Sequence, residues 1–282
     1  MNCLKIATSL LLLLPPCGYA AESTQLSSDQ ASVLESARAL AMQYTHVLPD
    51  FICLQTTHRS TVRSMDGGNM GTGISGRSPM AGMARSSGYA SDVIDEQLTY
   101  VGGKESYEVL AVNGKKVHGV DHLHFQGATS EGEFGSMLLQ VFDPASHTSF
   151  TWGHTASVHG RHAWVFEFEV PREAGTEVIA RDTDKEILVS ISGQVYIDPE
   201  TKEVLQISSR LDLPPGFPIR MAQRDIEYAP REIAGKNYSL PTRSLVHMED
   251  GKSVYDNRIE FKNYHRFASE STIHFDNANP QQ

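Results

Sequence analysis

The segment HGVDHLH, residues 118–124, brings three histidines close together. Imidazoles two and four residues apart can converge on a zinc ion, and Asp121 could bind the metal or orient one ring. On a strand His122 and His124 would share a face, whereas Gly119 favours a loop. No His-Glu-x-x-His or Cys-x-x-Cys motif completes the site. Our main expectation is therefore that the protein binds no metal or other cofactor. A zinc-dependent enzyme using His118, His122 and His124 stays an alternative.

Other patterns that could support catalysis are incomplete. Residues 73–76 (GISG) lack the second spacer of the Gly-x-Ser-x-Gly nucleophile elbow. Neither a phosphate-binding loop nor a dinucleotide fingerprint occurs in the chain. Glu131 and Glu133 flank a glycine. At that spacing in the first turn of a helix, we expect both carboxylates to interact favourably with the positive end of the helix dipole. We therefore expect a protein without enzyme activity.

The first twenty residues are typical of a secretory signal peptide. Lys5 precedes an apolar run at residues 6–14, and small residues stand at positions −3 and −1 before a cut after Ala20. The run is about half the roughly 20 residues needed to cross a bilayer. A lipid anchor on Cys17 would need a small residue before it, and Pro16 stands there. We expect export to the periplasm or the extracellular space and no transmembrane segment after processing.

Cysteine content and charge limit what the exported chain can do. Cleavage would remove Cys3 and Cys17 and leave Cys53 with no partner for an internal disulfide. Cys53 lies in an apolar run, which favours a buried small hydrophobe over a reactive thiol. Loss of Lys5 leaves 23 basic against 34 acidic residues, a net charge of −11. That charge argues against binding to nucleic acid or to an anionic membrane surface.

A helix is predicted over residues 33–48, because apolar residues recur there at the spacing of one helix face. The centre of that face holds Leu34, Ala37, Ala41, Tyr44 and Leu48. Val33, Leu40 and Val47 are expected to widen it. A serine or aspartate at residues 27–29 can cap the helix start, and Pro49 ends the helix. So wide an apolar stripe needs a large apolar partner.

The rest of the chain is predicted to form strands joined by short turns. Extended runs are expected at residues 51–59, 94–101, 107–112, 147–158, 161–170, 187–197, 205–213, 223–228, 240–248 and 253–264. Asn113-Gly114 is a typical two-residue hairpin turn, and His159-Gly160 is expected to close another hairpin. A second, short helix is expected at residues 132–142. The connections predict antiparallel neighbours, with one face of the sheet covered by the two helices.

We expect a single domain over residues 21–276. Residues 65–91, which hold seven glycines and four methionines, are predicted to be an irregular insertion in that domain. Residues 277–282 carry no apolar pattern and are predicted to be a disordered tail. The predicted fold class is mostly β (α+β), with about ten strands, one long N-terminal helix and one short helix.

Several motifs in the last part of the chain resemble a known family. They are QVYIDPETK at residues 194–202, VLQI at 204–207, IAGK at 233–236, LPTR at 240–243 and IEFKNY at 259–264. Together they resemble strands of the periplasmic lipoprotein carriers and of the related outer-membrane lipoprotein-sorting proteins. The resemblance spans residues 188–267 and implies a curved antiparallel sheet, an incomplete barrel, around an apolar cavity. Residues 48–53 and 127–135 look closer to a group of uncharacterised exported bacterial proteins.

The resemblance and the apolar faces lead to one main hypothesis. We expect an exported, non-enzymatic carrier that holds a lipid, an acyl chain or a lipoprotein anchor, because an apolar sheet face must be covered or filled. The interior is expected to be lined by Leu34, Leu40, Tyr44, Trp164, Phe166, Phe168, Ile191, Leu205 and Ile207. A structural or interaction domain with a filled core remains the alternative, since both arrangements use the same residues.

Overall fold

The computed structural model describes residues 25–63, 88–120, 132–180, 183 and 185–267. It contains two α-helices in these residues, α1 (Ser28–Val47) and α2 (Ser136–Phe142). The strands are β1 (Phe51–Arg63), β2 (Gly88–Val101), β3 (Lys104–Val112), β4 (Lys115–Lys116), β5 (Ser149–Val158), β6 (Arg161–Val170), β7 (Thr176–Ala180), β8 (Lys185–Val189), β9 (Ile191–Ile197), β10 (Val204–Leu211), β11 (Met221–Ile233), β12 (Lys236–Glu249) and β13 (Ser253–Arg266). Neither helix is long and apolar enough to cross a membrane within the described part of the chain.

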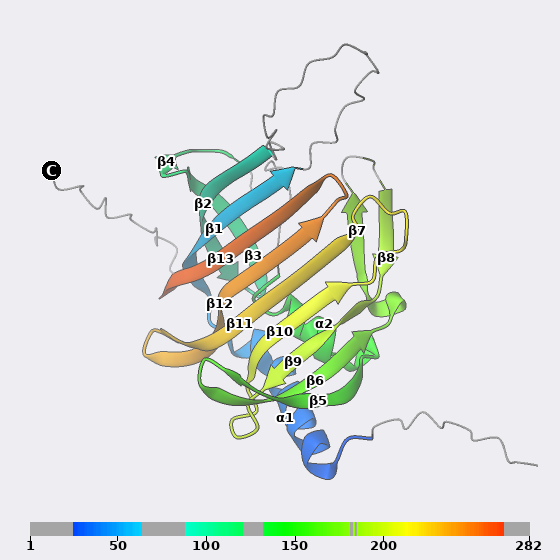
Figure 1. Ribbon diagram of the computed structural model, residues 1–282. Coiled ribbons are helices and arrows are strands. Elements are labelled where there is room, and N and C mark those ends of the chain that lie inside the picture. Colours follow the sequence, from blue (N-terminus) through cyan, green and yellow to red (C-terminus); the bar gives the residue numbers. More distant parts are fainter. Residues whose placement is uncertain (1–24, 64–87, 121–131, 181–182, 184, 268–282) are drawn as a thin grey trace, which may run out of the picture.

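Eleven of the strands form one open sheet, in the order β4-β3-β2-β1-β13-β12-β11-β10-β9-β6-β5 (Figure 1). All its neighbouring strands are antiparallel. The sheet curves but does not close, because β4 and β5 stay at opposite edges. A second sheet holds only β7 and β8. The mostly β fold class, with a curved antiparallel sheet and two helices, is confirmed.

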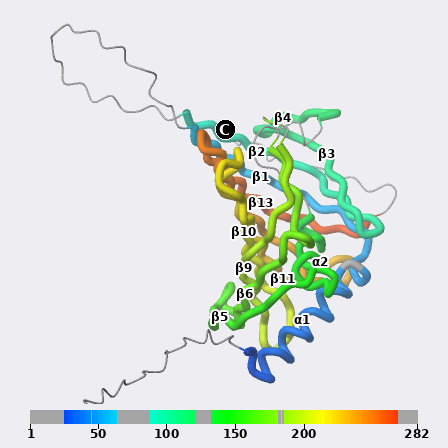
Figure 2. The backbone as a smooth tube through the Cα atoms, turned by 90° about the vertical axis from the view of Figure 1, so that its right-hand side faces the viewer, coloured from blue at the N-terminus to red at the C-terminus, as the bar shows by residue number. Residues whose placement is uncertain are grey.

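Both helices lie on the same side of the large sheet (Figure 2). We call this covered side the inner face and the opposite side the outer face. A continuous apolar core joins the helices to the inner face and runs from Phe51 on β1 to Phe166 on β6 and Ile191 on β9. The first and last strands, β1 and β13, pair in the middle of the sheet from Phe51–Arg266 to Arg63–Ser253. The core is thus shared by strands from both ends of the chain.

The start of α1 is fixed by the residues expected to cap it. The Ser27 hydroxyl accepts a hydrogen bond from the Gln30 amide at 3.2 Å, and the Gln30 side chain accepts one from the Ser27 amide at 2.9 Å. This reciprocal capping box satisfies two amides that a helix start leaves open. The helix ends at Val47, directly before the predicted end.

The buried side of α1 is narrower than expected. The central stripe is buried as predicted, and it consists of Leu34, Ala37, Ala41, Tyr44 and Leu48. Val33 is also buried, but Leu40 is 46% exposed and Val47 is 57% exposed. The prediction that Leu40 and Val47 widen the buried face is therefore wrong. Both lie on the flank of the helix just beyond the buried arc, where the described core does not cover them.

The region around β8 and β9 differs from the predicted single strand over residues 187–197. The extended run is interrupted at Ser190. Strand β8 before it pairs with β7 in the small sheet, and strand β9 after it joins the large sheet. The Ser190 hydroxyl bonds the Asp212 carboxylate at 3.1 Å. Ile187, Val189 and Ile191 keep the same period-two spacing on both sides of Ser190. The spacing of apolar residues therefore could not reveal that the chain passes from one sheet to the other. Strand β7 was not predicted.

Two further boundaries need correction. Strand β2 begins at Gly88, so the last four residues of the predicted insertion at 65–91 belong to a strand, and residues 64–87 lie outside the described residues. The short helix begins at Ser136 rather than at residue 132. Glu133 therefore lies before the helix, where it is 1% exposed, so the prediction that it is a charge in the first turn of the helix is wrong. Glu131 lies outside the described residues.

Candidate functional site

The histidine segment is described only in part. His118 is exposed and lies in the irregular stretch after β4. His122 and His124 fall outside the described residues. Among the residues that are described, no group of three or more His, Cys, Asp or Glu side chains is placed to hold a metal ion.

The inner face changes from apolar to polar along β1. On β1, Phe51 and Cys53 are buried at the end that begins the strand, and Gln55 and Thr57 are buried further along it. The Gln55 side-chain amide donates to the Glu96 carboxylate on the neighbouring strand β2 at 2.8 Å. Burial raises the pKa of the Cys53 thiol far above its ordinary value. The prediction that Cys53 is a buried small hydrophobe is confirmed.

The apolar end of the inner face is closed by an aromatic cluster. Phe51 stacks on Tyr100 of β2, with ring centroids 5.0 Å apart. Phe134, from the turn before α2, packs 5.3 Å from Phe51 and 5.1 Å from Phe261 of β13. Contacts of this kind add stability beyond the area that they bury. The segment that leads into α2 therefore covers this end of the inner face.

Glu105 of β3 holds the same turn in place. Its carboxylate accepts hydrogen bonds from the amides of Gly132 and Phe134, both at 3.1 Å, and from the hydroxyl of Tyr107. Burial raises the pKa of Glu105 above its ordinary value, against the three hydrogen bonds, which lower it. A single carboxylate thus anchors the entry to α2 on the edge region of the sheet.

The two tryptophans lie at the other end of the core. Trp152 of β5 packs edge-on against Trp164 of β6, with centroids 5.7 Å apart, and against Phe166 at 5.6 Å. Trp164 is partly buried, whereas Phe166 and Phe168 are buried. The chain contains only these two tryptophans, so its fluorescence reports on the inner face near β5 and β6.

Six of the nine residues expected to line the interior are buried together in the core: Leu34, Tyr44, Phe166, Phe168, Ile191 and Ile207. Trp164 packs against it from the side. Leu40 is exposed, as described above. Leu205 is buried on the outer face instead, where it contacts Val158 and Ala163.

The position of Leu205 follows from an irregularity in strand pairing. The register between β10 and β9 shifts between Val204 and Gln206, so Leu205 is an extra residue in its strand. A slip of one residue moves a side chain to the opposite face of a sheet. Leu205 and Ile207 therefore do not share a face, although their spacing of two predicts that they should.

Three buried tyrosine hydroxyls in the core have no hydrogen-bond partner among the described residues. They belong to Tyr44 of α1, Tyr100 of β2 and Tyr228 of β11, which we call the tyrosine cluster. Burial, followed by the nearby Tyr228, Tyr100 and Glu105, raises the pKa of Tyr44. Leaving a buried hydroxyl unpaired costs about 1–3 kcal/mol. Tyr100 and Tyr228 were not singled out from the sequence, although both alternate with apolar inner-face residues.

The outer face carries a different hollow. An open groove of about 740 Å³ crosses β5, β6, β9, β10 and β11. Its lining includes Glu167, Glu169, Gln194, Arg210 and Asp225, which alternate with the inner-face residues of the same strands. Phe168 is the one apolar side chain in this lining, so the groove is not the apolar cavity expected from the sequence.

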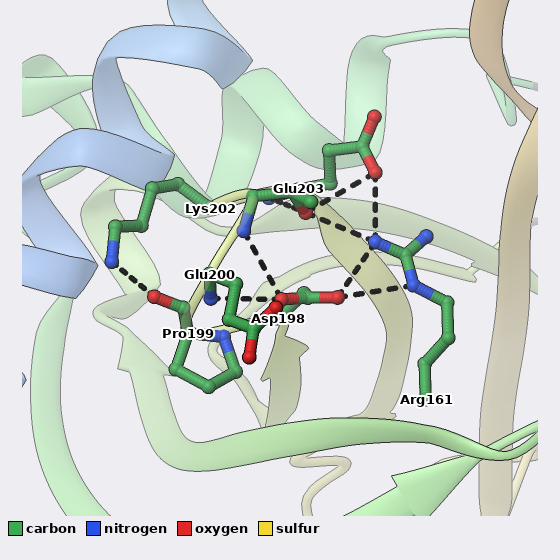
Figure 3. A network of polar contacts seen from close by, with 7 residues as sticks. Arg161, Asp198, Pro199, Glu200, Lys202 and Glu203 are labelled. Atoms are coloured by element: carbon green, nitrogen blue, oxygen red, sulfur yellow. Dashed lines mark hydrogen bonds and ion pairs between the residues drawn. The ribbon is translucent and has the colours of Figure 1, made fainter.

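The motif at residues 194–202 forms a tightly bonded turn. The Asp198 carboxylate accepts hydrogen bonds from the amides of Glu200 and Thr201, at 2.8 and 3.1 Å, and from Arg161 of β6 at 2.7 Å (Figure 3). Arg161 also bonds Glu203 at 2.9 Å. Burial alone would raise the pKa of Asp198, but these amides and the guanidinium lower it below its ordinary value. The turn of this motif, residues 198–202, therefore stabilises the β9–β10 hairpin, whereas Val195 and Ile197 of the same motif are buried in the core.

Comparison with known proteins gives structural similarity only. No protein-family model and no curated protein matches the chain. A LolA superfamily protein from Nitrosomonas europaea is 10% identical, with a TM-score of 0.36, over 83% of this chain and 91% of that one. A DUF1329 family protein from Desulfovibrio piger is 11% identical, with a TM-score of 0.39, over 84% and 95%. A domain described as an outer membrane lipoprotein-sorting protein, from Vibrio parahaemolyticus, is 12% identical, with a TM-score of 0.33, over 85% and 95%.

Two of these three names belong to the family that the sequence motifs resemble. All three TM-scores lie below 0.5.

Proposed function

We propose that the protein is an exported, non-enzymatic carrier that holds a lipid, an acyl chain or a lipoprotein anchor between its inner face and the helices α1 and α2. Export would follow from cleavage after Ala20, and a mass measurement of exported protein that finds Ala21 at the N-terminus would support it. The motifs between residues 188 and 267 agree with this proposal.

The observation that carries the proposal is how α1 is held. It covers the apolar inner face through side chains such as Leu34, Ala41 and Tyr44. Among the described residues, no backbone hydrogen bond joins α1 to the sheet. Moving the helix away from the sheet therefore breaks no hydrogen-bonded ladder, and an apolar ligand can replace the contacts that are lost. Each methylene that the ligand buries contributes about 0.8 kcal/mol, before the cost of association.

The alternative is a structural domain whose core is already full. It is favoured by the burial of Phe166, Ile191 and Ile207, each of which is 1% or less exposed. The two proposals differ in one respect. A carrier takes up an apolar molecule while it stays folded, whereas a filled core binds one only after it has loosened.

Binding of an apolar fluorescent probe to the folded protein distinguishes these proposals. We expect one site of about micromolar affinity or better, displacement of the probe by fatty acid or phospholipid, and a change in tryptophan emission from the Trp152–Trp164 pair. Replacement of Lys202, a residue of the β9–β10 turn that is not part of the apolar core, by alanine serves as the control and should leave the affinity for the probe unchanged. Binding that occurs only in heated or partly denatured protein would refute the carrier and favour the filled core.

A further inference from the structure

The tyrosine cluster brings three hydroxyl groups to the interior from three different elements. Tyr44 is 9% exposed, Tyr100 is 1% exposed and Tyr228 is 3% exposed. No described residue accepts from or donates to any of the three hydroxyls. Tyr264 is buried in the same core but differs, because its hydroxyl donates to the backbone carbonyl of Pro241. Unpaired hydroxyls are therefore a property of this cluster and not of every buried tyrosine in the core.

All three tyrosines belong to one apolar core. The Tyr44 phenol interacts electrostatically with those of Tyr228 and Tyr100. Tyr44 comes from α1, the helix that covers the inner face. Tyr100 comes from β2 and Tyr228 from β11, which are separated in the sheet by β1, β13 and β12. A ligand that enters between the helix and the sheet would meet all three groups. Each hydroxyl can donate one hydrogen bond to an oxygen of that ligand.

The charges around the tyrosine cluster limit which kind of ligand oxygen can bind there. The Glu105 carboxyl interacts with all three phenols, Asp50 with Tyr100, and Glu133 with Tyr228. Among the described residues, Arg224 is the basic group that influences the cluster, and it acts on Tyr228. Carboxyl groups thus outnumber the single guanidinium. A carboxylate or phosphate on the ligand would be repelled in this low-dielectric interior, whereas an uncharged carbonyl oxygen would not.

We propose that Tyr44, Tyr100 and Tyr228 form a subsite that binds the uncharged carbonyl oxygens of an acyl ester and disfavours free fatty acids. This inference rests on the proposed carrier function, since it assigns the polar end of the ligand that the interior would hold. The apolar core around the cluster then takes the acyl chain. The subsite makes the protein selective for esterified chains over the corresponding acids.

The test compares three ligands of equal chain length: methyl palmitate, palmitate and hexadecane. Each is used to displace an apolar probe from the protein without its signal peptide, at pH 8. We expect methyl palmitate to bind about tenfold more tightly than either of the other two, as one or two net hydrogen bonds would produce. The triple variant carries Tyr44→Phe, Tyr100→Phe and Tyr228→Phe. Its affinity for methyl palmitate should fall to the level of hexadecane, and its affinity for hexadecane should equal that of the parent protein.

Stability measurements separate binding from folding. The triple variant should unfold at the same temperature as the parent protein or higher, because it removes hydroxyls that are buried without a partner. Tyr264→Phe is the matched control, since it removes a buried hydroxyl that is paired. It should lower the unfolding temperature and leave the preference for the ester unchanged.

The outcomes distinguish the two proposals. If all three ligands bind equally, or if the triple variant keeps the preference for the ester, the subsite is refuted while the carrier function stands. A triple variant that is clearly less stable would show that the hydroxyls are paired in solution, and that result also refutes the subsite. If none of the ligands displaces the probe from the folded protein, the carrier function itself fails and the subsite fails with it.

Discussion

At the scale of single residues, Asp198 shows how one carboxylate can fix a hairpin. It accepts hydrogen bonds from two amides of its own turn and from Arg161 on the adjacent strand β6. The motif that carries the family resemblance therefore has a structural reason to hold an aspartate at this position. Asparagine would keep the shape of the side chain and lose its charge.

The Asp198→Asn variant should lose about 1–2 kcal/mol of unfolding free energy at pH 7. This is the contribution of a charge-assisted hydrogen bond, reduced because the partner Arg161 is partly exposed. Because folding lowers the pKa of Asp198, its contribution is complete above the ordinary pKa of an aspartate and is lost as the pH falls through the lowered value. Urea unfolding from pH 7 to pH 3 should therefore show the difference between variant and parent shrinking below about pH 4. Glu200→Gln, on the same turn, is the control. A difference that stays constant with pH would contradict this account.

At the scale of elements, Gly193 of β9 shows why a gap in an apolar strand is needed. A Cβ at this position would lie 2.1 Å from the Ser208 carbonyl oxygen and 2.8 Å from the ring of Phe168. Phe168 is the direct cross-strand partner of Gly193 on β6. The ring thus occupies the inner-face space that a side chain on β9 would fill, and it covers backbone that would otherwise be exposed.

Gly193→Ala should therefore lower the unfolding free energy by at least about 2 kcal/mol, as expected for overpacking against backbone. Ser192→Ala, on the neighbouring residue, removes only a 3.3 Å hydrogen bond to Asp212 and should cost less than about 1 kcal/mol. Denaturant unfolding of both variants measures the contrast. Equal costs would show that β9 can shift away from Phe168 and β10 to admit the extra carbon.

The elements also show how far the sequence could predict this structure. Helical spacing located α1 and its buried stripe, and period-two spacing located most strands of the large sheet. The same spacing misplaced Leu205, because a local register shift leaves composition and alternation unchanged. It also missed the change of sheet at Ser190. Such features depend on how neighbouring strands pair in space, which the spacing of apolar residues along the chain does not encode.

The candidate site was predictable only in its apolar half. Six expected interior residues meet in the core, since apolar residues on the covered faces of a helix and a sheet must be buried together. The tyrosine cluster could not be found in this way. Its members lie on α1, β2 and β11, and what distinguishes them is the lack of a hydrogen-bond partner, which depends on the neighbours in space.

At the scale of the whole molecule, the large sheet is expected to unfold as one unit. Two native reporters lie far apart on it: Cys53 on β1, and the Trp152–Trp164 pair on β5 and β6. In the sheet order β6 is the sixth strand after β1, yet one apolar core contains both Cys53 and Phe166. A chain this long can populate intermediates, so coincidence of the two reporters is informative.

We therefore predict that labelling of the Cys53 thiol and loss of the native tryptophan signal have the same midpoint in urea, measured on residues 21–282, in which Cys53 is the only cysteine. A bound apolar ligand should move both midpoints equally, because a ligand that binds only the native state stabilises the whole cooperative unit, by about 2.7 kcal/mol at one hundred times its Kd. Lys202→Ala should leave both the coincidence and the ligand-induced shift intact. A tryptophan signal that is lost well before Cys53 reacts would mean that β5, β6 and β9 form a separate unit. A ligand that moves only one midpoint would place its site in that unit alone, and not beneath the helix that covers the shared core.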